Sequence, residues 1–254
     1  MFNILVTGSK GFIGKNLLKK LKKLNKISGI HILEYNRGDS SEVLEKLLIK
    51  SDFIFHLAGE VRPDSSDKNF KKSNVSLTKE MIEILKKNKI RVPILLASTI
   101  HAVLLKNEYG KTKRDSELLV EEYSIKYNIN SFIYRLPHVF GEGCKINYNS
   151  VISTWIYNSI TDKEIVVYDR NIKICYAYVQ DIIEDFLYSL NNQKKLKLYL
   201  EPKQMFETTL GEVVDFISEF KQNVLMNNYE VENNSFKQKL FQTYKDYYRS
   251  LDEK

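Results

Sequence analysis

The chain has few of the residues that build disulfide frameworks or metal sites. Its 254 residues include two cysteines and four histidines. Cys144 and Cys175 are too few for a disulfide framework, and neither has a partner at metal-ligand spacing. The histidines are isolated from one another, at His31, His56, His101 and His138. We therefore expect no metal ligands, and the low cysteine content fits a reducing cytoplasm.

Long hydrophobic runs are also missing. No stretch approaches the ~20 apolar residues of a membrane helix. The N-terminal apolar run ends after Val6 and leads into a glycine turn, which predicts a core strand and not a signal peptide. The formal net charge of +7 comes mainly from lysines on helical patterns, without the interleaved aromatics of nucleic-acid grooves. We predict a cytoplasmic protein that binds neither membrane nor nucleic acid, and whose positive field favours an anionic substrate.

The first positive signal is a glycine-rich turn near the N-terminus. Residues 3–15 read NILVTGSKGFIGK, an apolar run followed by three glycines and a helical pattern. Gly8 permits the tight strand-to-helix reversal, Gly11 lets backbone N–H groups approach a pyrophosphate, and Gly14 lets the helix pack on the strand. The phosphates then lie at the positive end of the helix. This order of elements predicts a dinucleotide-binding turn.

Strand-like and helical segments alternate through the first half of the chain. The predicted strands are residues 2–7, 29–35, 52–58, 93–98 and 131–136. Buried apolar strands separated by amphipathic helices predict an α/β fold, a Rossmann-type doubly wound parallel sheet.

The alternation weakens beyond about residue 140. We predict a strand near 164–168 and helices near 149–160, 179–190, 210–220 and 235–248. We expect a single unit over residues 1–254, in which residues 1–140 mainly bind the dinucleotide and residues 141–254 mainly form a smaller substrate-binding portion.

The second chemical signal is a tyrosine and a lysine four residues apart. On a helix, Tyr109 and Lys113 share one face. The ammonium favours phenolate and brings the tyrosine pKa from about 10 toward the working range, so that Tyr109 can exchange a proton with a hydroxyl or a carbonyl. A hydroxyl at the end of the preceding strand, Thr99 or Ser98, can hydrogen-bond the same oxygen.

The residues after the second strand bear on the choice of cofactor. That strand closes with Asn36 and Arg37, and Lys10 lies inside the glycine turn. Two cations near the adenosine ribose favour NADP over NAD, because they pair with a 2′-phosphate. If Glu34 ends the strand instead, its carboxylate would bond the ribose 2′-hydroxyl and favour NAD.

Together these motifs resemble the extended short-chain dehydrogenase/reductase superfamily. The resemblance is carried by the glycine turn, FHLAG at 55–59, NV at 74–75, the Ser/Thr-Tyr-Lys set and YRLPHVFG at 134–141. More narrowly, the chain is similar to the reductase part of the CapF family of capsular polysaccharide enzymes, which reduces UDP-linked 2-acetamido-2,6-dideoxy-4-ketohexoses. The similar stretches are residues 11–17, 56–59, 62–63, 144–145, 147–152, 169–171, 178–179, 181–182 and 209–212.

The resemblance implies a set of site residues and a homodimer. The catalytic residues are Thr99, Tyr109 and Lys113. The cofactor-binding residues are Gly8, Lys10, Gly11, Phe12, Ile13, Gly14, Asn36, Arg37, Leu57, Ala58, Gly59, Asn74, Tyr109, Lys113 and Pro137. The substrate-binding residues are Arg62, Ser98, His138, Asn147, Asn149 and Arg170.

Three departures from the family pattern are visible. The chain stops about where the family's cupin epimerase domain would begin, so we expect no epimerisation at C3. Ile174 stands where an arginine often holds the diphosphate, a role that Arg170 or Lys173 can take. His138 stands where many relatives have asparagine.

The sequence thus predicts an NADPH-dependent reductase of the C4 ketone of a UDP-linked N-acetylated deoxysugar. One alternative is a sugar-nucleotide 4-epimerase or dehydratase with bound NAD. Ile100, His101 and Ala102 follow the catalytic hydroxyl, where a dehydratase usually needs an acid and a base. The other alternative is a dinucleotide-binding regulator without catalysis.

Overall fold

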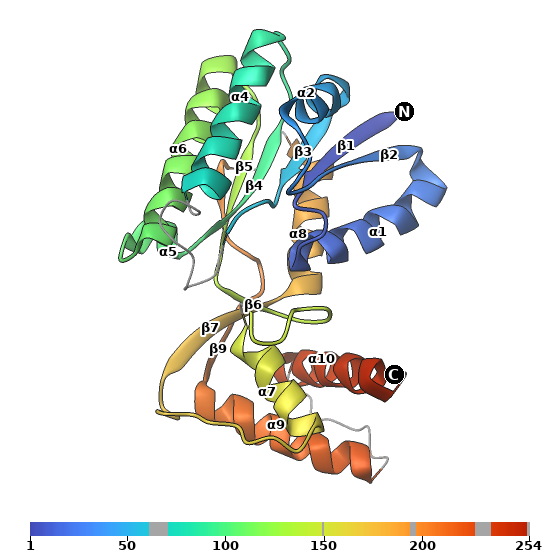
Figure 1. The fold of residues 1–254 in the computed structure, drawn as a ribbon, viewed down its shortest axis with the longest axis vertical. Coiled ribbons are helices and arrows are strands. Elements are labelled where there is room, and N and C mark those ends of the chain that lie inside the picture. The colour runs from blue at the N-terminus through green and yellow to red at the C-terminus, as the bar shows by residue number, and fades with distance from the viewer. Residues whose placement is uncertain (61–70, 149, 194–196, 227–234, 253–254) are drawn as a thin grey trace. The chain divides into compact units, whose positions relative to one another are not determined.

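A computed structural model describes residues 1–60, 71–148, 150–193, 197–226 and 235–252. Arg62 and Asn149, both predicted to contact the substrate, lie outside the described residues. The chain divides into two compact units: unit 1 is Met1–Leu136 with Ile183–Pro202, and unit 2 is Pro137–Ile182 with Lys203–Lys254. Each unit has its own sheet (Figure 1).

Unit 1 is built on a six-stranded parallel sheet in the order β2-β1-β3-β4-β5-β8. The strands are β1 (Phe2–Thr7), β2 (Ile30–Tyr35), β3 (Phe53–His56), β4 (Ile94–Thr99), β5 (Phe132–Leu136) and β8 (Tyr199–Leu200). The first five correspond to the predicted strands, and the predicted Rossmann-type fold is confirmed. From β1 the chain goes first to β2 on one side and later to β3 on the other. Ligands of doubly wound sheets bind at this reversal, beyond the carboxyl ends of the strands.

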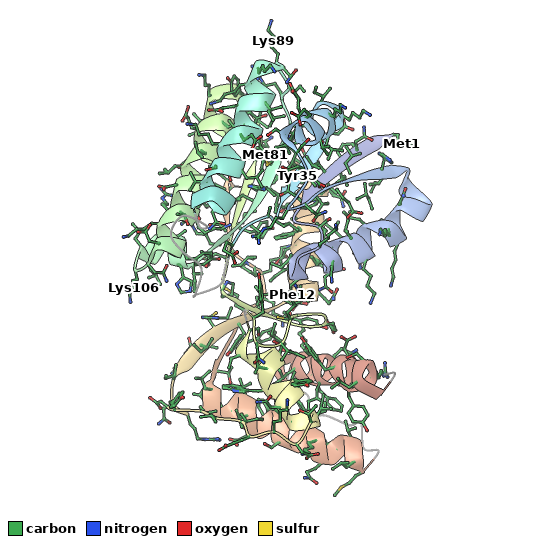
Figure 2. The ribbon with its side chains drawn as sticks, viewed as in Figure 1. Met1, Phe12, Tyr35, Met81, Lys89 and Lys106 are labelled. Atoms are coloured by element: carbon green, nitrogen blue, oxygen red, sulfur yellow. The ribbon has the colours of Figure 1, made fainter. Side chains whose placement is uncertain are left out.

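Helices cover both faces of this sheet (Figure 1). Helices α2 (Ser41–Lys50), α4 (Leu77–Lys87) and α6 (Glu108–Tyr127) bury their apolar stripes on one face, in a core that includes Met81 and Tyr35. Figure 2 shows these two side chains between the helices and the strands. Fully burying one such side chain contributes about 1.5–3 kcal/mol.

The other face is covered by α1 (Phe12–Ser28) and α8 (Val179–Asn191). The ring of Phe186 on α8 lies 6.1 Å from that of Phe55 on β3 and 5.0 Å from that of Tyr134 on β5. The short α5 (His101–Leu104) and a π-helical turn, η1 (Lys71–Ser76), complete the described elements of unit 1. Both contact α6, the helix that carries the predicted tyrosine and lysine.

The described residues of unit 2 form a three-stranded sheet and helices that pack on it. Strand β7 (Lys173–Tyr178) pairs in parallel with β6 (His138–Phe140) and antiparallel with β9 (Phe206–Thr209). The helices are α7 (Val151–Ile160), α9 (Leu210–Leu225) and α10 (Ser235–Asp252). The Phe236 ring on α10 packs against Phe140, 5.4 Å between centroids, and Tyr176, 6.1 Å. Aromatic packing therefore dominates this core.

The predicted strand at 164–168 is wrong. This segment is irregular, although its side chains do alternate: Ile165 and Val167 pack on the core, while Val166 and Tyr168 are exposed. A strand also needs a neighbour for its backbone hydrogen bonds, and the sheet of unit 2 is assembled from other segments. Side-chain alternation alone cannot distinguish a strand from an irregular segment that packs on a core.

Two further observations concern the described residues alone. None of their helices has the length and apolar character needed to span a bilayer. They also contain no group of three or more His, Cys, Asp or Glu side chains arranged to hold a metal ion.

Candidate functional site

The glycine turn follows β1 at the point where the sheet order reverses. Gly8 has a φ of +71°, and a Cβ there would lie 2.7 Å from the Ala58 nitrogen, so only glycine fits. A Cβ on Gly14 would lie 2.3 Å from the Gly8 oxygen. The turn is closed by hydrogen bonds of 2.9 Å from the Gly8 N–H to Tyr35 and from the Gly11 N–H to Gly8. The backbone is therefore held in the shape predicted for a nucleotide-binding turn.

Helix α1 begins in this turn and leaves its first N–H groups available. Its N-cap residue is Gly11, which supplies no side-chain cap, and its first turn contains no acidic residue. Phe12 and Ile13 are half-buried at the helix start, where Figure 2 labels Phe12. An uncapped helix N-terminus is the positive end of the helix dipole. The turn and the helix start fit an anionic group such as a pyrophosphate.

Two candidate cofactor-selecting side chains, Glu34 on β2 and Asn36 directly after it, lie at this turn. The Ser9 hydroxyl donates to the Glu34 carboxylate at 2.6 Å and accepts from the Asn36 amide at 2.8 Å. The Asn36 amide oxygen also accepts from the Lys10 N–H at 3.0 Å. Glu34 is the last outward-facing residue of β2, and Asn36 follows the strand. The sequence left open whether Asn36, with the cations Lys10 and Arg37, or Glu34 selects the cofactor, and in the structure both Glu34 and Asn36 bond with Ser9.

Arg37 is held by a residue that the sequence analysis missed. Its guanidinium donates to the Glu60 carboxylate at 3.2 Å. The Arg37 side chain is 75% exposed, whereas that of Glu60 is only 2% exposed. Glu60 directly follows the Leu57-Ala58-Gly59 segment after β3. Its position beside that motif is the only sequence signal that could have pointed to it.

A chain of buried hydrogen bonds connects the end of β1 to η1. His56 lies between the hydroxyls of Thr7, 2.7 Å from Nδ1, and Thr78, 2.9 Å from Nε2. Since Thr78 already donates to the Asn74 carbonyl at 2.7 Å, its oxygen accepts from Nε2–H. Burial, and secondarily the Lys113 charge, lower the pKa of His56 to about 3. His56 is therefore a neutral structural residue, as its isolation in the sequence suggested.

Asn74 joins the segment after β3 to helix α6. Its side chain accepts from the Glu60 N–H at 2.9 Å and donates to the Thr112 hydroxyl at 3.3 Å. A Cβ on Gly59 would lie 2.8 Å from the Asn74 amide oxygen and 3.7 Å from the Lys113 ammonium. Gly59, Asn74 and Lys113 are thus brought together, as predicted for residues of one cofactor site.

The predicted tyrosine lies in the first turn of α6, next to the end of β4. The helix starts at Glu108 because the Asn107 side chain accepts from the Gly110 N–H at 2.8 Å. The side chains of Tyr109 and Thr99 are hydrogen-bonded to each other. Thr99 is the hydroxyl beside the phenol, whereas the Ser98 hydroxyl donates to Glu117 at 2.6 Å.

The electrostatics of this tyrosine differ from the sequence prediction. Burial raises the pKa of Tyr109 to about 12, and the hydrogen bond with Thr99 only partly opposes it. The expectation that Lys113 brings the phenol pKa down toward the working range is not met in this structure, because burial dominates the pKa. The Lys113 ammonium instead donates to the Ala97 carbonyl at 2.5 Å. Because Lys113 is 5% exposed, burial lowers its pKa to about 8, against the opposing charge of Glu117.

Glu117 was also missed by the sequence analysis. It is fully buried on α6 and accepts hydrogen bonds from Ser98, Arg114 and Arg135. Its spacing of four from Lys113 and eight from Tyr109 is a helical signal that could have found it.

The remaining predicted residues belong to unit 2. Pro137 is buried and His138 exposed at the start of β6, with the His138 ring 5.9 Å from that of Tyr176. Asn147 is exposed, with its N–H bonded to the Thr154 hydroxyl at 3.0 Å. Arg170 pairs with both carboxylate oxygens of Asp215 at 2.7 Å, so substrate binding by its guanidinium would compete with this ion pair.

The doubly wound parallel sheet and its glycine turn define a Rossmann-type nucleotide-binding protein, and comparison with known proteins agrees. A family model described as the NAD dependent epimerase/dehydratase family matches residues 4–199. The chain therefore belongs to that family.

Individual relatives are more specific. The chain is 32% identical over 218 residues to UDP-2-acetamido-2,6-beta-L-arabino-hexul-4-ose reductase of Pseudomonas aeruginosa, covering 86% of this chain and 57% of the reductase. It is 26% identical to UDP-glucuronic acid decarboxylase 6 of Arabidopsis thaliana, covering 72% of this chain and 64% of that protein. It thus spans less than two thirds of the length of either relative.

A solved structure is also similar. The capsular polysaccharide assembling protein CapF from Staphylococcus aureus matches with a TM-score of 0.86 and 37% identity, over 100% of this chain and 67% of CapF.

Proposed function

We propose that this protein reduces the C4 ketone of a UDP-linked 2-acetamido-2,6-dideoxyhexos-4-ulose with NADPH, in the biosynthesis of a capsule or O-antigen sugar. The observation that carries the proposal is the contact of Tyr109 with Thr99, with Lys113 one helical turn along the same face of α6. A relative also supports the proposal: the Pseudomonas aeruginosa protein to which this chain is 32% identical is named UDP-2-acetamido-2,6-beta-L-arabino-hexul-4-ose reductase.

The cofactor supplies the hydride that adds to C4 of the ketone. The residues proposed to hold it are the glycine turn (Gly8, Lys10, Gly11, Phe12, Ile13 and Gly14), Asn36 and Arg37 after β2, Leu57, Ala58 and Gly59 after β3, and Asn74, Tyr109, Lys113 and Pro137. The uncapped start of α1 would face its diphosphate, and the Lys113 ammonium its nicotinamide ribose.

In the proposed reaction, Tyr109 donates its phenol proton to the carbonyl oxygen, which becomes the hydroxyl of the product. A phenol with a pKa of about 12 is protonated at neutral pH, as a proton donor must be. Thr99 orients the same oxygen. Lys113, with a pKa of about 8, is mostly charged at pH 7 and stabilises the phenolate that remains. A solvent proton then restores the phenol.

The test of this function is product formation. We expect stoichiometric oxidation of NADPH when the protein is mixed with a UDP-4-keto-6-deoxy-N-acetylhexosamine, with the new C4 hydroxyl identified by NMR. An epimerase would convert its substrate without net oxidation of cofactor. No turnover with a panel of such sugars would favour the regulator without catalysis.

The choice of cofactor gives a prediction about Arg37. We expect NADPH to bind more tightly than NADH, and Arg37→Ala to narrow the difference by about 1–3 kcal/mol, the scale of charge-assisted hydrogen bonds. Titration calorimetry measures both affinities. Lys89→Ala is the matched control, because it removes a positive charge just beyond the end of α4 and far from the labelled Phe12 in Figure 2. Tighter binding of NADH by the unmodified protein would show that Glu34 dominates instead.

The nucleotide part of the substrate gives a second prediction. Saturating UDP should raise the melting temperature of the cofactor-loaded protein, because a ligand at about 100 times its Kd stabilises the native state by about 2.7 kcal/mol. CMP at the same concentration is the control and should leave the melting temperature unchanged. An equal response to both nucleotides, or to neither, would argue against a UDP-sugar substrate. The proposed contacts are Arg62, Ser98, His138, Asn147, Asn149 and Arg170.

Other parts of the proposal extend beyond the site. We propose that the protein is cytoplasmic and acts as a homodimer.

A further inference from the structure

Three consecutive residues at the end of β4 are each bonded to one face of α6. The Ala97 carbonyl accepts from the Lys113 ammonium at 2.5 Å, the Ser98 hydroxyl donates to Glu117 at 2.6 Å, and Thr99 bonds with Tyr109. Tyr109, Lys113 and Glu117 follow each other at four-residue spacing, so they form one stripe along the helix. Two of these pairs belong to the proposed reaction, and the third, at Glu117, has no assigned role.

We call this contact between the end of β4 and helix α6 the β4–α6 seam. The Glu117 carboxylate lies in it, and each of its two oxygens accepts two hydrogen bonds. Its Oε1 accepts from Ser98 at 2.6 Å and from Arg135 Nε at 3.1 Å. Its Oε2 accepts from the second Arg135 nitrogen at 2.7 Å and from Arg114 at 2.9 Å. Ser98 and Arg135 are register partners on β4 and β5, which brings both donors to the same place.

Glu117 is ionised despite its burial. Burial acts to raise the pKa of this carboxyl, but the hydrogen bonds from Arg135, Ser98 and Arg114 outweigh it, and the pKa is lowered. A buried carboxylate with such partners carries a fixed negative charge at every pH of interest.

This charge acts on Lys113. Burial lowers the pKa of the ammonium to about 8, and the attraction of Glu117 is the effect that opposes further lowering. The other ionisable groups around Lys113 in the described part of the chain are His56 on β3 and Tyr109 on α6, with His101 of α5 against the Tyr109 ring. His56, with a pKa of about 3, is neutral near pH 7, and Arg114 and Arg135 are paired with Glu117 itself.

We propose that Glu117 is a positioning residue that keeps Lys113 charged and fixes the β4–α6 seam on which the proton donor lies. The inference rests on the proposed reductase function, because it assigns Glu117 a part in that reaction. Among the described residues, the hydrogen bonds of Glu117 join it to Ser98, Arg114 and Arg135, so it acts through Ser98 and, by its charge, through Lys113.

The direct test is the titration of Lys113 in Glu117→Gln, followed by NMR in protein labelled with 13C at lysine Cε. The Lys113 signal, identified by its loss in Lys113→Met, should titrate near pH 8 in the unmodified protein, far below an ordinary lysine at about 10.4. In Glu117→Gln the midpoint should fall by about one pH unit, because the opposing charge is gone. An unchanged midpoint in the folded variant would overturn the proposal.

The matched control is Glu121→Gln, one turn further along α6. It makes the same acid-to-amide change and loses the hydrogen bond from Tyr199 at 2.8 Å. Glu121 contacts neither Ser98 nor Arg135 in the hydrogen bonds of the described residues, so the Lys113 midpoint should stay in place. An equal shift in this control would reduce the effect to general electrostatics of α6 and overturn the specific role of Glu117.

A second variant covers the case in which Glu117→Gln does not fold, since it leaves the half-buried Arg135 without its carboxylate. The double variant Glu117→Gln/Arg135→Gln removes both charges, and the Lys113 midpoint should fall there by less than in Glu117→Gln, because the lost Arg135 cation repelled the ammonium. Glu117→Asp keeps the charge and should restore the midpoint toward pH 8. A double variant that titrates like the unmodified protein would also contradict the proposal.

Kinetics separate this inference from the proposed function. With ketone substrate, the loss of kcat at high pH should begin about one unit lower in Glu117→Gln, with a smaller change in KM for the ketone. If the NMR midpoint moves but no ketone sugar is turned over, the reductase function fails and the effect on Lys113 stands. If turnover occurs and neither the midpoint nor the pH profile moves, the role of Glu117 fails alone.

Discussion

Tyr109→Phe is expected to lower NADPH-dependent turnover of a 4-keto sugar nucleotide by about 100-fold or more, while the fold and the cofactor site survive. The substitution removes one oxygen, the proposed proton donor, and losses of this size are usual for a positioned general acid. The ring can keep its contact with His101, whose centroid lies 6.2 Å away. The measurement is the rate of NADPH oxidation, together with calorimetry of cofactor binding.

Tyr127→Phe at the end of the same helix is the control. It removes the same atom from a ring on which the Arg91 guanidinium stacks at 3.6 Å, far along α6 from Tyr109. We expect normal turnover in this variant. Near-normal turnover of Tyr109→Phe with intact binding would exclude the tyrosine as the proton donor. Thr99→Ala should cost less than Tyr109→Phe if water can replace its hydrogen bond.

The second large effect is expected from Lys113→Met, which should lower turnover and weaken cofactor binding together. The ammonium is proposed both to stabilise the phenolate and to hold the nicotinamide ribose. In the unmodified protein, turnover should fall as the pH rises through about 8, because Lys113 is charged below its pKa and neutral above it. The variant should be slow at every pH and lack this decline.

The melting temperature of Lys113→Met distinguishes the loss of a catalytic role from damage to the fold. The pKa of Lys113 is depressed in the folded protein, so the buried charge costs stability at neutral pH, and this cost disappears as the pH rises through the folded pKa toward the unfolded value of about 10.4. A methionine carries no charge, and the melting temperature of Lys113→Met at pH 7 should not fall. A large fall in melting temperature would attribute the lost activity to misfolding.

The sequence alone determined five of the six strands in the sheet of unit 1 and the glycine turn after β1. Both are local signals: each strand is a short apolar run, and Gly8 is required by a backbone φ of +71°. The pairing of Tyr109 with Lys113 is local too, since helical periodicity fixes it. These features follow from residues near one another in the chain.

The tertiary structure alone decided what depends on residues far apart in the chain. The segment 164–168 has strand-like alternation but is irregular, because ladder hydrogen bonds need a neighbouring strand. The Arg37 partner, Glu60, lies 23 residues away, and Glu117 is assembled with Ser98 and Arg135 from two other elements. The direction of the Tyr109 pKa belongs here as well, because burial raises it and the Lys113 ammonium is bonded to Ala97 instead. Burial and long-range pairing arise only when the elements pack, so the sequence alone can name candidate residues but not their electrostatic surroundings.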